Sequence, residues 1–261
     1  LHHELTLPPF RGALVRQIRV DPILRPDLER AIALLARVLN ITFSGVQGGK
    51  AGKGKEESFH HGVFGQPGRC VAVLNIGGIA NLSVLKADGS VLGWDCGPGN
   101  ALMDFWCARH TGQSFDRDGA WAASGQLHPE LLLKMTGESF LHKQPPKSTG
   151  RDLFNSTWLA SALSRFPGVS PVDVQATLGE LTAVSCADAL LRWGPASREL
   201  LVCGGGAFNT HLMTRLQTAL PSVRVMGTQA RGLPPLQVEA AAFAWLARQT
   251  VLGLPGNLPA V

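Results

Sequence analysis

The stretch Cys70-Val-Ala-Val-Leu-Asn-Ile-Gly-Gly-Ile-Ala-Asn-Leu-Ser-Val-Leu85 decides the fold of this chain. Apolar runs on both sides of the paired glycines predict two buried strands, residues 70–75 and 81–85, that turn back at Gly77-Gly78. Glycines let the backbone approach a ligand closely, and successive N–H groups in such a turn form an anion-binding nest. An ordinary hairpin with a glycine turn is the alternative interpretation of this stretch alone.

A second junction of strand and glycines follows at Trp94-Asp-Cys-Gly-Pro-Gly-Asn100. Asp95 ends a predicted strand, which is where α/β folds place functional groups. The turn after Asp95 leads into a helix whose N-terminal N–H groups would suit a phosphate. An aspartate beside a phosphate site is a natural general base, and capping of the turn by Asp95 is the structural alternative.

A third junction, Leu201-Val-Cys-Gly-Gly-Gly-Ala-Phe-Asn209, again joins an apolar strand to a helix through glycines. Consecutive glycines destabilise most elements by roughly 0.5–1 kcal/mol each relative to alanine, so we expect a flat or charged ligand against them. A nucleotide is the obvious candidate. Strands that alternate with helices around these junctions predict an α/β architecture, with its longest helix at residues 171–193.

Two further polar stretches are poorly suited to a core. Phe115-Asp-Arg-Asp-Gly119 presents two carboxylates and a guanidinium, and Lys147-Ser-Thr-Gly-Arg151 presents two cations with hydroxyls. Either stretch would suit sugar hydroxyls, phosphate or Mg²⁺, and either would equally form a solvated loop with internal ion pairs. Glu239 adds a carboxylate at the start of an apolar helix, where it is a candidate ligand or a favourable partner of the helix dipole.

The composition is that of a globular protein with many turns. Of 261 residues, 45% are hydrophobic and 16% are charged, and 30 glycines and 17 prolines take the place of the missing charge. The formal net charge of +5 suits an anionic small ligand and does not demand nucleic acid. Because the five cysteines include no CxxC spacing, we expect buried reduced thiols rather than a metal site or disulfides.

The sequence gives little support for a membrane protein or for a P-loop nucleotide-binding protein. No apolar stretch approaches the ~18 residues of a membrane span and no secretory signal is visible, so we expect a cytoplasmic protein without a membrane partner. Gly49-Lys-Ala-Gly-Lys-Gly-Lys55 matches the glycine and lysine positions of a Walker A loop, but Glu56 replaces the Ser or Thr that would bind Mg²⁺. The residues that follow do not predict a core-packing helix. The lysines also lack the interleaved aromatics of a nucleic-acid binder.

Together these stretches resemble the anhydro-N-acetylmuramic acid kinase family of actin-like sugar kinases. The resemblance runs from about Phe59 to the C-terminus. The matching stretches, in order, are residues 74–81, 95–104, 115–125, 146–151, 175–178, 202–209 and 243–245.

The resemblance implies an α/β, actin/hexokinase/Hsp70-like (ribonuclease H-like) two-domain fold with ATP and Mg²⁺ in the cleft. It implies hydrolytic opening of 1,6-anhydro-N-acetylmuramic acid with phosphorylation of O6, which gives N-acetylmuramate 6-phosphate. The partner is then a small amino sugar, with no nucleic acid or membrane, and a homodimer is left open. Asp95 would be the catalytic base. The cofactor-binding candidates are Asn75, Gly77, Gly78, Asn81, Gly97, Gly99, Asn100, Gly204, Gly205, Gly206 and Asn209, and the substrate-binding candidates are Asp116, Asp118, Lys147, Arg151 and Glu239.

The chain departs from the family pattern before Phe59. The family opens with a strand and a Ser-Gly-Thr-Ser-x-Asp-Gly phosphate loop, which residues 1–58 do not match. We expect residues 1–69 to be a remnant of an incomplete N-terminal actin-like domain, partly disordered, with a helix at 27–39 and a loop at 44–58. Residues 70–261 are expected to form the C-terminal nucleotide-binding and catalytic domain. The alternatives are another actin-like sugar or acetate kinase, or a catalytically impaired fragment or paralogue that binds nucleotide or sugar without turnover.

Overall fold

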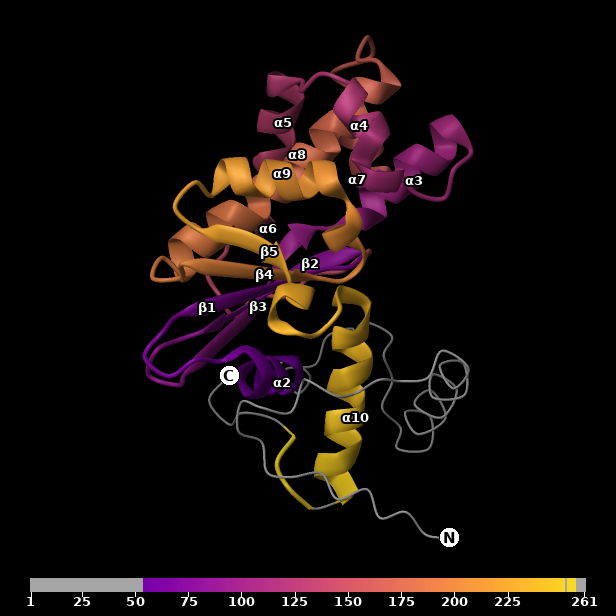
Figure 1. Cartoon of the computed structure of the whole chain (residues 1–261). Helices are drawn as coiled ribbons and strands as arrows, with labels where there is room; N and C mark the ends of the chain where they lie inside the picture. Colours follow the sequence, from indigo (N-terminus) through magenta and orange to yellow (C-terminus); the bar gives the residue numbers. More distant parts are fainter. Residues whose placement is uncertain (1–53, 252, 257–261) are drawn as a thin grey trace, which may run out of the picture.

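A five-stranded mixed sheet forms the centre of the molecule (Figure 1). The computed structural model describes residues 54–251 and 253–256. Strand β2 is antiparallel to both of its neighbours, and β4 and β5 continue the sheet parallel to β1. The order of the strands is β3-β2-β1-β4-β5, and the mixed sheet with its helices confirms the predicted α/β class. The strands are β1 (Val71–Ile76), β2 (Ile79–Leu85), β3 (Val91–Pro98), β4 (Glu199–Cys203) and β5 (Arg224–Gly227).

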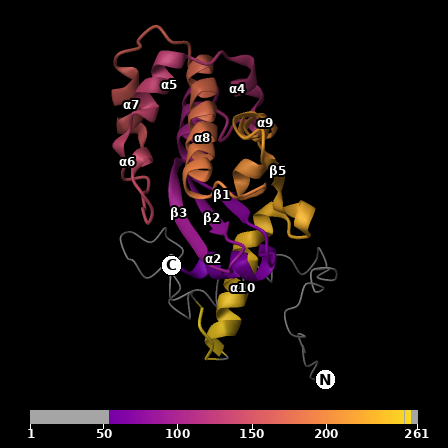
Figure 2. The same ribbon diagram turned by 90° about the vertical axis from the view of Figure 1, so that its left-hand side faces the viewer.

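Helices cover both faces of the sheet (Figures 1 and 2). Helices α3 to α9 lie on one side, and α2 and α10 lie on the other. The helix predicted at 171–193 is confirmed with the same bounds, and helices also follow the second and third glycine junctions, as predicted. The α-helices are α2 (Gly54–Phe64), α3 (Asn100–Thr111), α4 (Ala120–Ser124), α5 (Pro129–Thr136), α6 (Ser139–His142), α7 (Ser156–Leu163), α8 (Pro171–Trp193), α9 (Thr210–Ala219) and α10 (Val238–Val251). Short 3₁₀ helices are η2 (Arg117–Gly119), η3 (Gly205–Phe208), η4 (Thr228–Arg231) and η5 (Pro235–Gln237).

Side chains alternate along the strands between two cores. In β1, Ala72, Leu74 and Ile76 pack into a large cluster that includes α8. Val71 and Val73 point to the other face and pack into a smaller cluster beneath α2 and α10. Because both faces are buried, β1 reads as a nearly continuous apolar run, which is why the sequence predicts it so clearly.

The long helix α8 begins and ends where the sequence predicts. The Ser170 hydroxyl accepts a hydrogen bond from the Asp173 N–H at 3.3 Å, and Pro171 occupies the first turn. At the other end the Gly194 N–H donates to the Leu190 carbonyl at 2.8 Å. Between these ends, the Thr182 hydroxyl of α8 donates to the Pro98 carbonyl at 3.0 Å, which ties the helix to the end of β3.

Helix α2 corrects two expectations. The sequence predicts a loop at residues 44–58 and no core-packing helix after it. Residues 54–58 instead begin a helix whose Phe59 and Phe64 are buried in the smaller core. His60 is also buried; its Nδ1 lies 3.0 Å from the Ser83 hydroxyl, and burial lowers its pKa to about 4. Tertiary packing, not helix propensity, stabilises this segment, so a window of sequence alone does not reveal it.

Several sequence predictions fall outside the described residues. These are the helix at 27–39, most of the glycine–lysine loop at 49–55 and most of the N-terminal remnant, so the domain division at residue 69 stays a prediction. All five cysteines are free thiols, as predicted, and four of them are buried. Within residues 54–251 and 253–256, no helix is both long and apolar enough to cross a bilayer.

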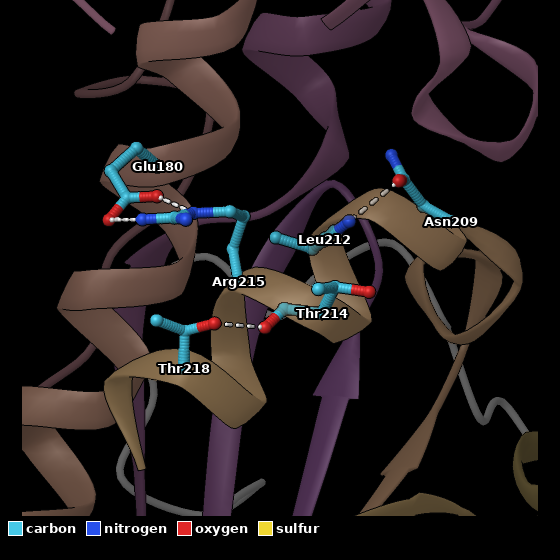
Figure 3. Close-up of polar contacts among 6 residues, drawn as sticks. All are labelled: Glu180, Asn209, Leu212, Thr214, Arg215 and Thr218. Carbon is cyan, nitrogen blue, oxygen red and sulfur yellow. Dashed lines mark hydrogen bonds and ion pairs between the residues drawn. The ribbon is translucent and has the colours of Figure 1, made fainter. Parts of the chain in front are cut away.

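An ion pair joins α8 to α9 (Figure 3). The Arg215 Nε donates to one carboxylate oxygen of the buried Glu180 at 2.5 Å, and its Nη2 donates to the other at 3.0 Å. Arg215→Ala would leave Glu180 buried without this cation, so we expect the free energy of unfolding to fall by about 2 kcal/mol in chemical denaturation.

The surface pair Arg192–Asp188 is the matched control. Its N–O distance is 2.8 Å, but both side chains are 47% exposed. Arg192→Ala should therefore change stability by less than about 0.5 kcal/mol. Equal losses for the two variants would contradict a special contribution of the α8–α9 ion pair.

Candidate active site

Three polar side chains form a row across the end of the sheet. Asn81 of β2 lies opposite Asn75 of β1 on one side and opposite Asp95 of β3 on the other. All three are half-buried. The pairing of β2 with β3 shifts between Ala80 and Asn81, which makes Cys96 the extra residue of a β-bulge. Bulges of this kind commonly re-aim a side chain beside an active site, and here one brings Asp95 into line with the asparagines.

The first two glycine junctions meet directly beside this row. The Asn100 N–H donates to the Gly77 carbonyl at 2.8 Å, and the Gly99 N–H donates to the Gly78 carbonyl at 3.0 Å. The Ala101 N–H donates to Gly78 as well, at 3.2 Å. The start of α3 was expected to offer its first N–H groups to a phosphate. The structure instead uses those of Asn100 and Ala101 to hold the Gly77-Gly78 turn.

Close packing accounts for several of the predicted ligand-binding glycines. A Cβ at Gly99 would collide with the Gly77 carbonyl oxygen, and one at Gly97 would lie 2.7 Å from Leu141. By contrast, a Cβ at Gly77 would meet nothing closer than the Ile79 carbonyl at 3.8 Å. Of these three glycines, therefore, Gly77 alone leaves backbone that a ligand could approach.

The triple glycine after β4 packs against the end of β1. Gly204 has a positive φ of 76°, and a Cβ there would lie 2.7 Å from the Ile76 carbonyl oxygen and would collide with the Asn75 side chain. A Cβ at Gly206 would lie 2.6 Å from the Ile76 side chain. Gly205 is exposed, and its nearest neighbour would be the Asn100 amide nitrogen at 3.4 Å. Packing thus requires Gly204 and Gly206, and Gly205 faces open space.

Asp95 is held by the segment 147–151. Its Oδ2 accepts hydrogen bonds from the Ser148 hydroxyl at 2.7 Å and from the Thr149 N–H at 2.8 Å. Its own N–H donates to the Lys147 carbonyl at 3.2 Å. The sequence marks this segment as polar but does not single out Ser148 and Thr149, because its two cations look like the chemically active residues.

Lys147, a predicted substrate-binding residue, is held by contacts within the fold. Its ammonium donates to the Phe140 and Leu141 carbonyls at 3.1 and 2.9 Å and lies 4.7 Å from the Phe140 ring centroid. The residue is buried, and this burial lowers its pKa. These contacts make Lys147 an internal anchor of the segment, and its predicted contact with the sugar stays a prediction.

Arg151, at the other end of the segment, covers the Gly77-Gly78 turn. A Cβ at Gly78 would lie 3.0 Å from the Arg151 Nη2 and 3.6 Å from the Ala101 Cβ. Arg151 is itself exposed. A guanidinium above a glycine turn is suited to bind an anion, because it presents several donors in a planar fork.

The polar stretch 115–119 has mainly structural contacts. The Asp116 carboxylate accepts from the Trp121 and Ala122 N–H groups at 2.9 and 2.8 Å, which caps α4. Asp118 is exposed with a positive φ of 58°, and its carbonyl accepts from the Thr210 hydroxyl at 3.0 Å. A carboxylate in a polar loop suits a ligand or a helix cap equally well, and for Asp116 the structure provides the cap.

Two further candidates lie at helix ends. The Asn209 Oδ1 accepts from the Leu212 N–H at 2.9 Å and so caps α9 (Figure 3). A Cβ at Gly119 would collide with this amide, which places the 115–119 stretch against the last glycine junction. Glu239 is exposed in the first turn of α10. The sequence-predicted candidates that meet around the sheet end are thus the polar row, the glycine turns and Arg151.

Asp104 was not predicted as a site residue. It lies in α3, one turn beyond Asn100, and burial raises its pKa to about 6 against an opposing attraction to Arg151. A half-buried carboxylate with a raised pKa is typical of functional sites. At such sites the negative charge is retained although its burial destabilises the folded protein. The sequence signal is a carboxylate in the second turn of a helix that follows a glycine turn.

The raised pKa predicts a pH-dependent stability for Asp104→Asn. Between pH 4 and pH 6 the unfolded state loses the Asp104 proton while the folded state keeps it, so wild-type stability falls over this interval. Asparagine carries no such charge. After a discount for solvent screening of this half-exposed group, we expect the variant to gain about 2 kcal/mol over wild type at pH 8 and almost nothing at pH 4, measured by urea unfolding at both pH values. A gain that is equal at the two pH values would contradict this assignment.

Comparison with known proteins places this geometry in a family. A family model described as anhydro-N-acetylmuramic acid kinase matches residues 45–261. The chain belongs to the anhydro-N-acetylmuramic acid kinase family. Similar relatives bear that name in Albidiferax ferrireducens, with 56% identity over 224 residues, and in Variovorax paradoxus, with 57% identity over 209 residues. Each alignment covers 78% of this chain and 58% or 56% of the relative, so the chain spans less than two thirds of their length.

Proposed function

We propose that this protein is an ATP-dependent kinase that hydrolytically opens 1,6-anhydro-N-acetylmuramic acid and phosphorylates O6 to give N-acetylmuramate 6-phosphate. The observation that carries the proposal is the row Asn75–Asn81–Asp95, in which a carboxylate stands beside two glycine turns and a guanidinium. Membership of the anhydro-N-acetylmuramic acid kinase family supplies the substrate class.

The glycine turns fit the phosphates of a nucleotide. Gly77 and Gly205 leave open space where a Cβ would stand, and Arg151 covers the neighbouring Gly78. These three positions would hold the phosphate oxygens, with Asn75 and Asn81 at their border. ATP together with Mg²⁺ supplies the phosphoryl group and screens its charge when bound.

In this proposal Asp95 is the general base. Its carboxylate accepts a proton from the water molecule whose oxygen bonds to C1 of the sugar, and the bond between C1 and O6 breaks. O6 then bonds to the γ-phosphorus of ATP, the bond from that phosphorus to its bridging oxygen breaks, and ADP leaves. A general base of this kind contributes about 10²–10⁴ in rate. Ser148 and Thr149 keep one of its oxygens in a fixed position throughout.

The substrate contacts are fewer than the sequence suggests. Lys147 and Asp116 are engaged in the fold, so we do not include them among the proposed sugar contacts. Arg151 is retained as an anion contact. Asp118 and Glu239 are exposed and stay candidates for the sugar.

Family membership also helps to choose between this activity and the alternative functions. The relatives are named for one anhydro-sugar kinase activity, which favours this enzyme over another actin-like kinase or a non-catalytic binding protein. We propose that the protein works in the cytoplasm, where ATP is available, and that its partner is a small amino sugar rather than nucleic acid. A homodimer stays a prediction.

A coupled assay of ADP release tests the proposal. Purified protein with Mg-ATP should release ADP when 1,6-anhydro-N-acetylmuramic acid is added and not when the already opened N-acetylmuramic acid replaces it. Equal ADP release with and without the anhydro-sugar would contradict the proposed reaction.

A further inference from the structure

We propose that Ser148 is a positioning residue that sets the orientation of the Asp95 carboxylate. The inference rests on the proposed function, because it concerns the group that we assign as the base. It adds a role for a side chain that neither the sequence motif nor family membership assigns.

The evidence for this role is the set of hydrogen bonds that the 147–149 segment makes with Asp95. The serine hydroxyl and the adjacent Thr149 N–H converge on one oxygen, Oδ2, at 2.7 and 2.8 Å. Two donors on one oxygen define the plane of the carboxylate as well as its position. A third contact, from the Asp95 N–H to the Lys147 carbonyl at 3.2 Å, fixes the backbone of the strand against the same segment.

The segment that contains Ser148 is anchored to the fold, so it can hold the Asp95 carboxylate in place. Lys147 is buried, and its ammonium is tied to two backbone carbonyls. Ser148 itself is exposed, so its hydroxyl contributes little to the stability of the fold. An exposed hydroxyl bonded to a candidate catalytic carboxylate therefore matters for chemistry more than for folding.

Loss of the Ser148 hydroxyl should slow turnover because a general base works only over a short distance. A base must lie within hydrogen-bond distance of the proton that it accepts, and a misplacement of about 1 Å costs up to about 100-fold in rate. Loss of the hydroxyl leaves the Thr149 N–H in place, so the carboxylate keeps its location but gains rotational freedom. The defect should fall on kcat, since binding of sugar and nucleotide does not depend on that rotation.

The chain contains a matched control for this contact. In the β2–β3 turn, the Ser90 hydroxyl and N–H converge on one oxygen of Asp88 at 2.7 and 2.8 Å. That turn lies at the opposite end of β3 from the Gly97–Gly99 turn. Ser90→Ala removes the same kind of bond at the same distance without touching the site.

The experiment compares Ser148→Ala, Ser148→Thr and Ser90→Ala by steady-state kinetics with Mg-ATP and 1,6-anhydro-N-acetylmuramic acid. We expect Ser148→Ala to lose about 10- to 100-fold in kcat with KM and melting temperature unchanged. Ser148→Thr, which keeps a hydroxyl, should recover most of the loss, and Ser90→Ala should equal wild type. Adding Ser148→Ala to Asp95→Asn should cause no further loss.

The outcomes separate this inference from the function on which it rests. If wild type turns over the sugar and Asp95→Asn does not, but Ser148→Ala equals wild type, the role of Ser148 is overturned and the function stands. A loss in Ser148→Ala that threonine does not restore, or that comes with a higher KM, also overturns it. A wild-type protein without turnover overturns the proposed function and this role together.

Discussion

Asp95→Asn is expected to abolish turnover of the anhydro-sugar while leaving nucleotide binding intact. The side chain retains its shape, so the Ser148 and Thr149 donors keep an oxygen to bond. What is lost is the capacity to accept a proton from water, which contributes about 10²–10⁴ in rate. The measurement is kcat from ADP release, together with ATP affinity by titration calorimetry.

Asp88→Asn is the control for this experiment. Asp88 accepts the same two kinds of donor, a serine hydroxyl and an N–H, but lies in the β2–β3 turn. This variant should turn over sugar at the wild-type rate. Retained turnover in Asp95→Asn would remove Asp95 from the role of base, whatever its place in the polar row.

Gly204→Ala should cause the largest loss of stability of any substitution in the glycine turns. Gly204 has a φ of 76° and a ψ of −176°, a region that is essentially restricted to glycine. A Cβ would also lie 2.7 Å from the Ile76 carbonyl oxygen. Backbone strain and overpacking together should lower the free energy of unfolding by about 3 kcal/mol, measured by chemical denaturation.

The adjacent glycine provides the comparison. A Cβ at Gly205 would approach only the Asn100 amide nitrogen, at 3.4 Å, so Gly205→Ala should leave the stability almost unchanged. Because Gly205 faces open space where we propose the nucleotide binds, the same variant should weaken ATP binding. A stable Gly204→Ala protein, or a Gly205→Ala protein with normal ATP affinity, would contradict the division of these glycines into packing and ligand positions.

The sequence predicts the sheet and most helices because the local patterns are strong. The apolar runs of β1 and β4 and the capped helix α8 carry their own signals in hydrophobicity, glycine and N-cap residues. Helix α2 lacks such a signal, since Phe59 and Phe64 gain their stability only from contact with the distant sheet.

The site was harder to predict than the fold. The alignment of Asn75, Asn81 and Asp95 depends on strand register and on the bulge at Cys96, and neither is a local property of the sequence. Glycines are equally ambiguous, because a glycine required by a neighbouring backbone and one required by a ligand look the same in a sequence. The contact of Ser148 with Asp95 spans 53 residues, so only the fold brings the two side chains together.

The most direct test of the proposed reaction is to run it with Mg-ATP and 1,6-anhydro-N-acetylmuramic acid in oxygen-labelled water and to analyse the products by mass spectrometry. We expect a sugar that has gained one water and one phosphoryl group, with the label on the sugar and not in the phosphate. Unchanged sugar from folded protein, or label in the phosphate, would contradict it.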